Sequence, residues 1–270
     1  MGIDDDDAIK VWIGRHMIVK QLFDSLKKTC GRIPENYLAV DIETSGFGGQ
    51  CNILQIGHCL VEGGKVIDRN AFLLDWRQAT ITTPSRHVQW MKTLREDVDK
   101  LEAEMRSKGR HFHTTWDRLC QDGCDPIVIL REYHDWFSEL KDRKWFILMH
   151  NGYAFDCRFF HGHFKAFLDV DWDFGDNTII DTGAVFKAAQ LNMFANPGES
   201  LRDFSGRVLQ VRAKGVRWSL NDYVVPTMKL DSKYQLNKES AHDAGYDSYV
   251  AHLMFEELRN TYLEQSQESK

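Results

Sequence analysis

Hydrophobic residues follow two different spacings along the chain, and these predict an order of elements. Residues 18–26 carry apolar side chains at helical spacing before Gly31 and Pro34, so a helix leads in. Three apolar stretches then predict strands, over Leu38–Ile42, Ile53–Val61 and Val66–Trp76. Glycine pairs at 48–49 and 63–64 supply the turns, so this part is predicted to be a short meander.

A charged segment then interrupts the strands. From Thr83 to Gly109 the apolar residues recur three and four positions apart. This spacing predicts an amphipathic helix of about six turns. We expect the helix to fold over the body of the protein, and the alternative is a surface for a partner helix.

The sheet is predicted to resume after this helix. Two helices, split by Gly123 and Pro126, precede the apolar run Trp145–Met149, which is typical of a strand buried on both faces. A loop and helix, a short strand in "NTIIDT" (177–182) and further helices follow. We therefore predict an α/β fold with a mixed central β-sheet flanked by helices and interrupted by helical insertions, and a ribonuclease-H-like arrangement fits this order.

Composition limits the classes of function. The chain has 270 residues, of which 43% are hydrophobic, enough for one α/β domain with a sizeable core. Its apolar runs are too short to span a membrane and its N-terminus lacks the order of a secretory signal, so we expect a cytoplasmic protein. The net charge of −6 argues against a general nucleic-acid-coating protein but not against a nuclease, because carboxylates around cations contribute to that charge.

The cysteines suggest no special chemistry. All six are scattered, and Cys120 and Cys124 form a C-x3-C pair without a second pair. We expect structural thiols in preference to a zinc site or disulfides.

Two carboxylates stand one residue apart at the end of the first predicted strand. Asp41 and Glu43 would leave the same face of that strand, where like charges repel unless a cation lies between them. Hard ions such as Mg²⁺ bind carboxylate oxygens. D-x-E is a weak pattern by itself, and the alternative is a solvated strand end.

A second polar group follows the buried strand Trp145–Met149. The segment "HNGYAFD" places Asn151 and Asp156 at the carboxyl end of this strand, where open α/β sheets bind ligands. The alternative is that Asn151 is an ordinary loop residue and that Asp156 is a charge favoured by the dipole of a helix N-terminus.

A third group lies near the C-terminus. In "SAHDAGYD" the residues Ser240 and Asp243 suit a capping box, so His242 would precede a helix that carries Asp247. His242 and Asp247 could then face one point. A surface histidine near a helix start is the alternative.

Together these segments resemble one family. The D-x-E of Asp41 and Glu43, the N-x3-F-D ending at Asp156 and the H-x-A-x-x-D of His242 and Asp247 look like the three motifs of the DEDDh exonucleases. This family includes polymerase proofreading ε-type subunits, ribonuclease T and oligoribonuclease. The histidine at 242 marks the DEDDh branch. The resemblance covers 38–72 and about 125–263.

The resemblance implies a two-metal mechanism for hydrolysis of phosphodiester bonds. Asp41 would bridge two Mg²⁺ ions, for which Mn²⁺ is expected to substitute. Glu43 and Asp247 would complete the site of one ion and Asp156 would support the other. His242 would be the general base for the attacking water.

The resemblance also implies residues that bind the substrate. Backbone donors at Thr44 and Ser45 could hold the terminal nucleotide, and Phe47 stands where relatives carry a leucine that wedges against the 3′-terminal base. Asn151 is assigned to substrate binding as well, although the loop after it holds three residues where many members have two. The alternative for Phe47 is a core aromatic.

A basic segment at 199–217 has five cationic and two acidic side chains. It is a candidate surface for guiding a nucleic-acid strand, and a solvated helix face is the alternative. We divide the chain into an N-terminal acidic segment and lead-in helix (1–36), an exonuclease domain (37–263) with a helical insertion at about 83–110, and a C-terminal tail (264–270).

We therefore expect a metal-dependent 3′–5′ exonuclease that releases nucleoside 5′-monophosphates from single-stranded ends, with DNA favoured. The alternatives are an exonuclease of RNA or oligoribonucleotides, a proofreading subunit that binds a polymerase through the helix at 83–109, and a non-catalytic nucleic-acid-binding module. No membrane partner is expected, and the sequence leaves the oligomeric state open.

Overall fold

A five-stranded mixed β-sheet forms the centre of the computed structural model, which describes residues 5–48, 51–79 and 84–268. Its strands are β1 (Tyr37–Thr44), β2 (Ile53–Glu62), β3 (Lys65–Leu73), β4 (Phe146–Met149) and β5 (Ile179–Asp181). All five were predicted from the sequence. The third is shorter than predicted, because the chain leaves the sheet after Leu73 to form an isolated bridge between Leu74 and Cys124.

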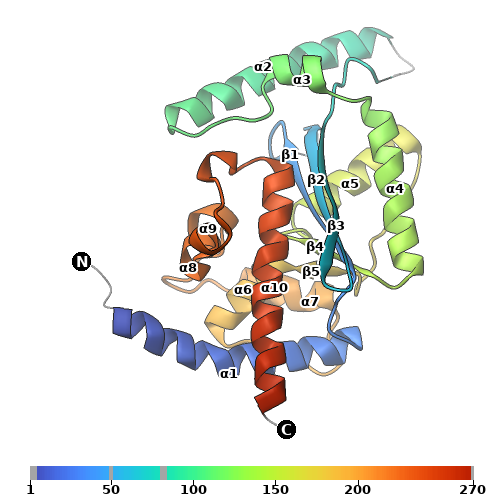
Figure 1. Ribbon diagram of the computed structural model, residues 1–270. Coiled ribbons are helices and arrows are strands. Elements are labelled where there is room, and N and C mark those ends of the chain that lie inside the picture. Colours follow the sequence, from blue (N-terminus) through green and yellow to red (C-terminus); the bar gives the residue numbers. More distant parts are fainter. Residues whose placement is uncertain (1–4, 49–50, 80–83, 269–270) are drawn as a thin grey trace.

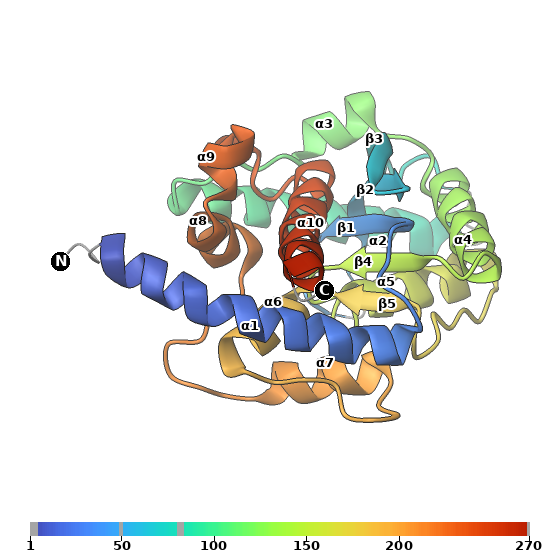
Figure 2. The same cartoon turned by 60° about the horizontal axis from the view of Figure 1, so that its bottom comes forward.

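The strand order is β3-β2-β1-β4-β5 (Figure 2). The pairs β1–β2 and β2–β3 are antiparallel and form the predicted meander, whereas β4 and β5 run parallel to β1. The carboxyl ends of β1, β4 and β5 therefore lie at one edge of the sheet. Ligands bind at this edge in open α/β sheets.

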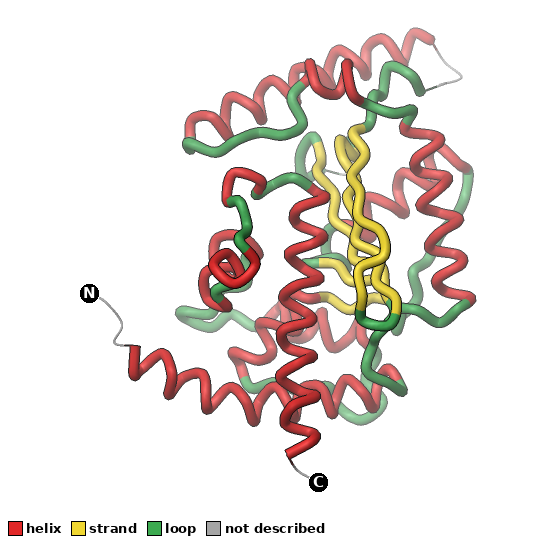
Figure 3. The backbone as a smooth tube through the Cα atoms, in the orientation of Figure 1, coloured by secondary structure: helices red, strands yellow, loops and turns green. Residues whose placement is uncertain are grey.

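Helices cover both faces of the sheet (Figure 1, Figure 3). They are α1 (Asp5–Cys30), α2 (Pro84–Ser107), α3 (Trp116–Asp122), α4 (Pro126–Asp142), α5 (Asp156–His163), α6 (Thr182–Leu191), α7 (Leu201–Gln210), α8 (Val225–Met228), α9 (Leu230–Tyr234) and α10 (Ala244–Glu268). Two π-helical turns, Phe164–Leu168 and Leu220–Val224, and a 3₁₀ turn, Lys238–Ser240, complete the chain.

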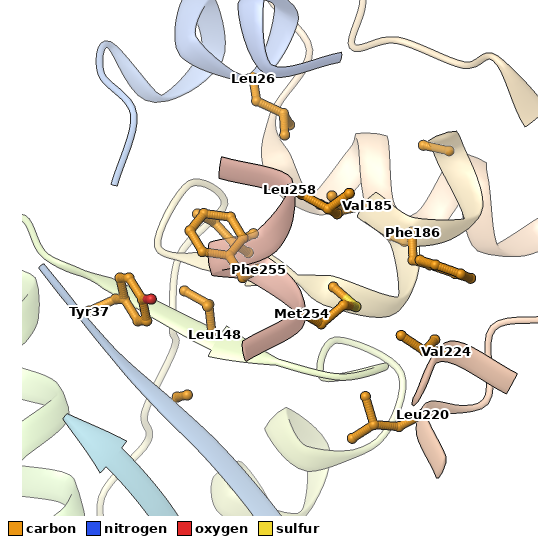
Figure 4. Packing of buried hydrophobic residues seen from close by; sticks show 14 of the residues in the cluster. Leu26, Tyr37, Leu148, Val185, Phe186, Leu220, Val224, Met254, Phe255 and Leu258 are labelled. Atoms are coloured by element: carbon orange, nitrogen blue, oxygen red, sulfur yellow. The ribbon is translucent and has the colours of Figure 1, made fainter. Parts of the chain in front are cut away.

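Alternating residues of the strands build two cores, one on each face. On β1, Tyr37 and Ala39 point into a cluster with α1, α6 and α10, which Figure 4 shows around Met254 and Phe255. The intervening residues of β1, Leu38 and Val40, point into a second cluster with α4 and α5. Both faces are therefore sealed by apolar packing, and the polar residues of β1 begin where the first cluster ends.

The insertion lies across one end of the sheet, where α2 and α3 cross above the strands in Figure 1. Leu94 and Val98 of α2 are buried in the second core cluster. The prediction that this helix folds over the body of the protein is therefore confirmed. Thr83, the first residue of the predicted helix, lies outside the described residues, as does Gly49 of the first glycine turn.

The first and last helices of the described residues are longer than the sequence patterns predicted. Helix α1 begins at Asp5, inside the acidic run, and its later residues Leu22 and Phe23 are buried against α10 in the first core cluster. Helix α10 continues to Glu268, so the predicted C-terminal tail is helical over 264–268. No helix break separates these residues from the rest of α10, since they contain neither glycine nor proline.

Two other features bear on the predictions. Within the described part of the chain, no helix has the length and apolar character that crossing a bilayer requires. All six cysteines are free thiols, and Cys59 and Cys157 are buried.

Candidate active site

Asp41 and Glu43 lie near the carboxyl end of β1, where they continue its alternation of side chains between the two faces. They follow Tyr37 and Ala39 on the face that α10 covers, and both are partly buried. The register pairs Asp41 with Gly57 and Glu43 with Gln55 of β2, with an irregularity directly after Glu43. The two carboxylates therefore project from one face at the carboxyl edge of the sheet, as predicted.

A close approach of backbones brings α10 to these carboxylates. A Cβ at Gly57 would lie 2.1 Å from the carbonyl carbon of Ala244, the first residue of α10, so only glycine fits there. Gln55 fixes the same contact, because its Nε2 donates to Asp243 Oδ2 at 2.8 Å and its Oε1 accepts from the Ala244 N–H at 3.1 Å. The start of α10 thus lies directly on the residue that pairs with Asp41.

Asp247 is carried into the site by the first turn of α10. Its side chain is 6% exposed, and its Oδ1 accepts a hydrogen bond of 2.8 Å from Asn221 Nδ2. Asp243 caps the helix, since its Oδ1 accepts from the Tyr246 N–H at 3.0 Å. The predicted capping box with Ser240 is not formed, because Ser240 ends a separate 3₁₀ turn and α10 begins only at Ala244.

His242 precedes α10 with a left-handed backbone, at φ of 66°. One ligand atom from each of Glu43, His242 and Asp247 lies within 4.8 Å of the others. Burial and the nearby Arg110 guanidinium lower the pKa of His242, so its imidazole is neutral at pH 7 and can accept a proton. The predicted approach of His242 and Asp247 to one point is confirmed.

Asp156 reaches the site from the loop after β4. It is the first residue of α5, is 2% exposed, and its buried Oδ1 has no hydrogen-bond partner. Asn151 adopts φ of 66° in the same loop, and its N–H donates to Asp181 Oδ1 at 3.0 Å. This hydrogen bond ties the loop to the end of β5.

Without a cation, the acidic side chains of this site disfavour one another's negative charge. Burial raises the pKa of Asp41 and of Glu43 well above the usual range, and for both residues the negative charge of Asp247 is the next largest cause. Burial also raises the pKa of Asp156 to about 8 and that of Asp247 to about 7. Asp41, Glu43, Asp156 and Asp247 therefore form a buried set of mutually repelling carboxylates, which we call the carboxylate cage.

These side chains suit a divalent cation. Every member of the carboxylate cage offers hard oxygen ligands, and the lone buried Oδ1 of Asp156 has acceptor capacity that no protein donor uses. A cation between the carboxylates would replace the repulsion by attraction. The residues present therefore fit Mg²⁺ or Mn²⁺.

Two residues next to the carboxylate cage were not predicted from the sequence. Asp181 ends β5, is 1% exposed, and burial raises its pKa to about 6. Its Oδ1 caps α6 by accepting from Ala184 N–H at 3.0 Å, while its buried Oδ2 has no hydrogen-bond partner. A carboxylate at the end of a parallel strand is the signal that could have identified it. Asn221 had no local signal, because its partner Asp247 lies on another helix.

The residues predicted to bind a nucleotide have different surroundings. Thr44 Oγ1 donates to the Gly46 carbonyl at 2.7 Å. Ser45 is buried, and its N–H donates to the Asn52 carbonyl at 2.8 Å. The loop therefore uses this donor internally in the described conformation, and nucleotide binding at Thr44 and Ser45 stays a prediction.

Phe47 is far from being a core aromatic. Its side chain is 87% exposed, and its ring centre lies 6.0 Å from that of Phe155. A pocket of about 270 Å³ lies beside these two rings and is also lined by Asn52, Arg158 and Phe159. An exposed aromatic at the rim of a pocket is available for stacking.

The basic segment at 199–217 is partly neutralised. Arg202 pairs with Asp173 at 2.9 Å and Arg207 pairs with Glu199 at 2.6 Å, so the cations on α7 are engaged within the protein. Arg212, Lys214 and Arg217 are exposed on the loop that follows α7. Guidance of a nucleic-acid strand stays a prediction for this loop alone.

Comparisons with known proteins found a similar fold but no similar sequence. No protein-family model matches the chain, and no curated protein matches its sequence. Solved structures do match. E. coli exonuclease I bound to zinc and single-stranded DNA superposes with a TM-score of 0.52 at 16% identity, over 82% of this chain and 40% of that chain.

Two further structures of exonuclease I give similar values. The E. coli enzyme with a dT13 oligonucleotide has a TM-score of 0.52 at 16% identity, over 86% of this chain and 43% of that one. A product-bound structure has a TM-score of 0.50 at 16% identity, and the match covers 86% of this chain and 45% of that one. The present chain thus spans less than half the length of these proteins. The predicted fold is confirmed, because the chain has the ribonuclease-H-like α/β fold of exonuclease I.

Proposed function

We propose that the protein is a metal-dependent 3′–5′ exonuclease that removes nucleoside 5′-monophosphates from the 3′ ends of single-stranded DNA. The observation that carries the proposal is the convergence of the carboxylate cage with a neutral histidine at the carboxyl edge of the sheet. The shared fold supports it, since solved structures of exonuclease I hold single-stranded DNA.

The carboxylate cage would hold two Mg²⁺ ions, which supply Lewis-acid stabilisation of charge on the phosphate and lower the pKa of a bound water. Neutral His242 accepts a proton from the attacking water. The water oxygen bonds to phosphorus, and the bond from phosphorus to the 3′ oxygen breaks. The 3′ oxygen takes a proton from solvent, so the shortened strand ends in a 3′ hydroxyl, and His242 later returns its proton to solvent. Asn221 orients Asp247 through its hydrogen bond, so that this carboxylate keeps one rotamer.

DNA is the substrate we favour over RNA. Two of the matched exonuclease I structures contain single-stranded DNA, and the sequence offers no pattern that reads a 2′ hydroxyl. A proofreading partnership through the insertion has no support in the fold, because Leu94 and Val98 of α2 are used in the protein's own core.

The direct test uses 5′-labelled strands. Single-stranded DNA, double-stranded DNA and RNA are incubated with Mg²⁺, with Mn²⁺ or with a chelator, and the products are separated on a denaturing gel. We expect a ladder of 3′-shortened single-stranded DNA that requires the metal. A ladder on RNA alone would change the substrate class, and its absence on every strand would favour a non-catalytic binding module.

Metal and pH should act together on stability. The folded protein holds protons on Asp156 and Asp247, whose raised pKa values are about 8 and about 7, while the unfolded chain loses them near pH 4. Without metal, the melting temperature should therefore fall as the pH rises from about 5 to about 8. Stabilisation by Mg²⁺ or Mn²⁺ should grow over the same range, because cations bind the deprotonated carboxylates.

Differential scanning fluorimetry with a chelator or with added metal measures both trends. The control variant is Asp68→Asn on β3, an exposed carboxylate outside the carboxylate cage, which should keep both trends. Metal stabilisation that does not change with pH would contradict the assignment of these carboxylates as ligands.

Stacking by Phe47 predicts a loss of affinity. In the Phe47→Ala variant, KM for single-stranded DNA should rise about 5-fold to about 150-fold, since stacking of a base on an aromatic ring contributes about 1–3 kcal/mol. Because the side chain is 87% exposed, its removal should leave the melting temperature unchanged. Phe47→Trp should retain the affinity. Equal KM values for the alanine variant and the parent would exclude the stacking role.

A further inference from the structure

A second feature beside the carboxylate cage is a cleft of about 980 Å³ that opens next to His242. One wall is the end of the insertion, with Arg106, Arg110 and His111. The opposite wall is formed by the π-helical turn Leu220–Val224 and the loop before α10. The cleft thus leads from solvent to the proposed general base, between two segments that are far apart in the sequence.

Arg110 spans this cleft. Its Nη2 donates to both carboxylate oxygens of Asp222, at 3.2 and 3.1 Å, and its Nη1 lies 3.3 Å from His242 Nε2. Asp222 directly follows Asn221, which binds Asp247. One guanidinium therefore touches the proposed base and a carboxylate on the turn that supports the carboxylate cage.

The ion pair between Arg110 and Asp222 is weak enough for another anion to replace Asp222. The two side chains are 40% and 63% exposed, and exposed ion pairs contribute little to stability. The other lysine and arginine side chains that line the cleft pair with carboxylates outside its lining, Arg106 with Glu102 and Lys238 with Asp231. In the free protein Asp222 uses only Nη2 of Arg110. A guanidinium can bind phosphate oxygens through two parallel hydrogen bonds, so a phosphate could replace Asp222 and engage a second nitrogen as well.

Arg110 also limits proton acceptance by His242 in the free protein. If Nη1 donates to Nε2 of His242, this nitrogen cannot accept a proton from water at the same time. Movement of Arg110 onto a phosphate would release the imidazole. Binding of a strand and release of the base would then be one event.

We propose that Arg110 is a substrate-binding residue that exchanges Asp222 and His242 for a phosphate of the single-stranded DNA bound in this cleft. The inference rests on the proposed exonuclease function, and it assigns to the insertion a contact with the strand at the point of cleavage. The ligand group is the phosphodiester of the strand, which the guanidinium binds without regard to the base.

Binding can be measured apart from turnover. Fluorescence anisotropy of a labelled oligo(dT) is followed over a range of salt concentrations in the Asp41→Asn background with a chelator. Arg110→Ala should weaken binding about 10-fold to about 100-fold, because charged hydrogen bonds are lost. It should also lower the slope of log Kd against log salt by about 0.7, the value for one phosphate contact to a single strand.

Three variants make the test specific. Arg110→Lys keeps the charge and should restore the salt slope. Asp222→Ala frees the guanidinium and should tighten binding by up to about 5-fold. The matched control is Lys92→Ala, which removes an exposed cation from α2 away from the cleft and should leave both affinity and slope unchanged.

The results separate the two proposals. If Arg110→Ala binds DNA with the affinity and salt slope of its Asp41→Asn parent, or if Lys92→Ala loses as much, the role of Arg110 is overturned even where the wild-type protein produces a ladder. If Arg110→Ala weakens binding but no metal produces a ladder with the wild-type protein, the binding role stands and the exonuclease function fails. No binding by the Asp41→Asn parent overturns the role of Arg110, whereas the exonuclease function is decided by the ladder of the wild-type protein alone.

Discussion

Replacement of Asp41 by asparagine should lower turnover on single-stranded DNA by at least about 10³-fold, because metal-bound charge stabilisation amounts to several kcal/mol and each 1.36 kcal/mol is a factor of ten. Asp41 stands on β1 at the centre of the carboxylate cage, where the charges of Asp247, Asp156 and Glu43 all raise its pKa. An amide keeps the shape of the side chain and removes its charge. Initial rates with saturating Mg²⁺ measure the loss.

The same substitution should stabilise the protein in a chelator. Asp41→Asn removes one of the repelling charges from a buried set, so its melting temperature without metal should exceed that of the wild type. Isothermal titration calorimetry should show weakened or absent Mg²⁺ binding. Retention of turnover would exclude Asp41 from the reaction, and a lower melting temperature would mean that the loss of activity reflects misfolding.

The second large effect is expected at His242. His242→Ala should reduce turnover about 10²-fold to about 10⁴-fold, the usual contribution of a general base, while Mg²⁺ binding is retained. The neutral imidazole of the wild type should also produce a fall in kcat/KM at acid pH, as His242 becomes protonated. This acid limb should be absent in the variant.

Controls for His242 follow from its backbone. Because His242 has φ of 66°, alanine is strained at this position, and His242→Asn provides a variant that tolerates the left-handed conformation. Both variants should lose turnover equally. His111→Ala removes an exposed histidine of the same cleft and should remain within about 10-fold of the wild type. Full activity of either His242 variant would remove the general base from the proposal.

Much of the fold could be predicted because its signals are local. The apolar alternation on β1 fixed which residues face each core, and the same parity placed Asp41 and Glu43 on one face. The glycine pair at 63–64 and the buried run before Asn151 likewise identified a turn and a central strand. Each of these depends on neighbours within a few residues.

The rest of the site depends on distances between elements, which local patterns do not contain. Asp181 lies close to Asp156 only because β5 is parallel to β4, and Asn221 reaches Asp247 only because a π-helical turn packs beside α10. Arg110 comes to His242 through the placement of a whole insertion. The internal hydrogen bond of Ser45 depends on the return of the chain at Asn52, seven residues later.

The approach of α10 to Gly57 has a consequence for mutational scans of this protein. Gly57 has no side chain, takes no part in the chemistry and lies in the middle of a strand, yet a single added carbon would collide with the backbone at Ala244. Any larger residue would displace the start of α10, and with it Asp247, from Asp41. A scan scored on activity would therefore rank Gly57 beside the proposed metal ligands, although this residue offers no ligand atom and only sets the spacing of those that do.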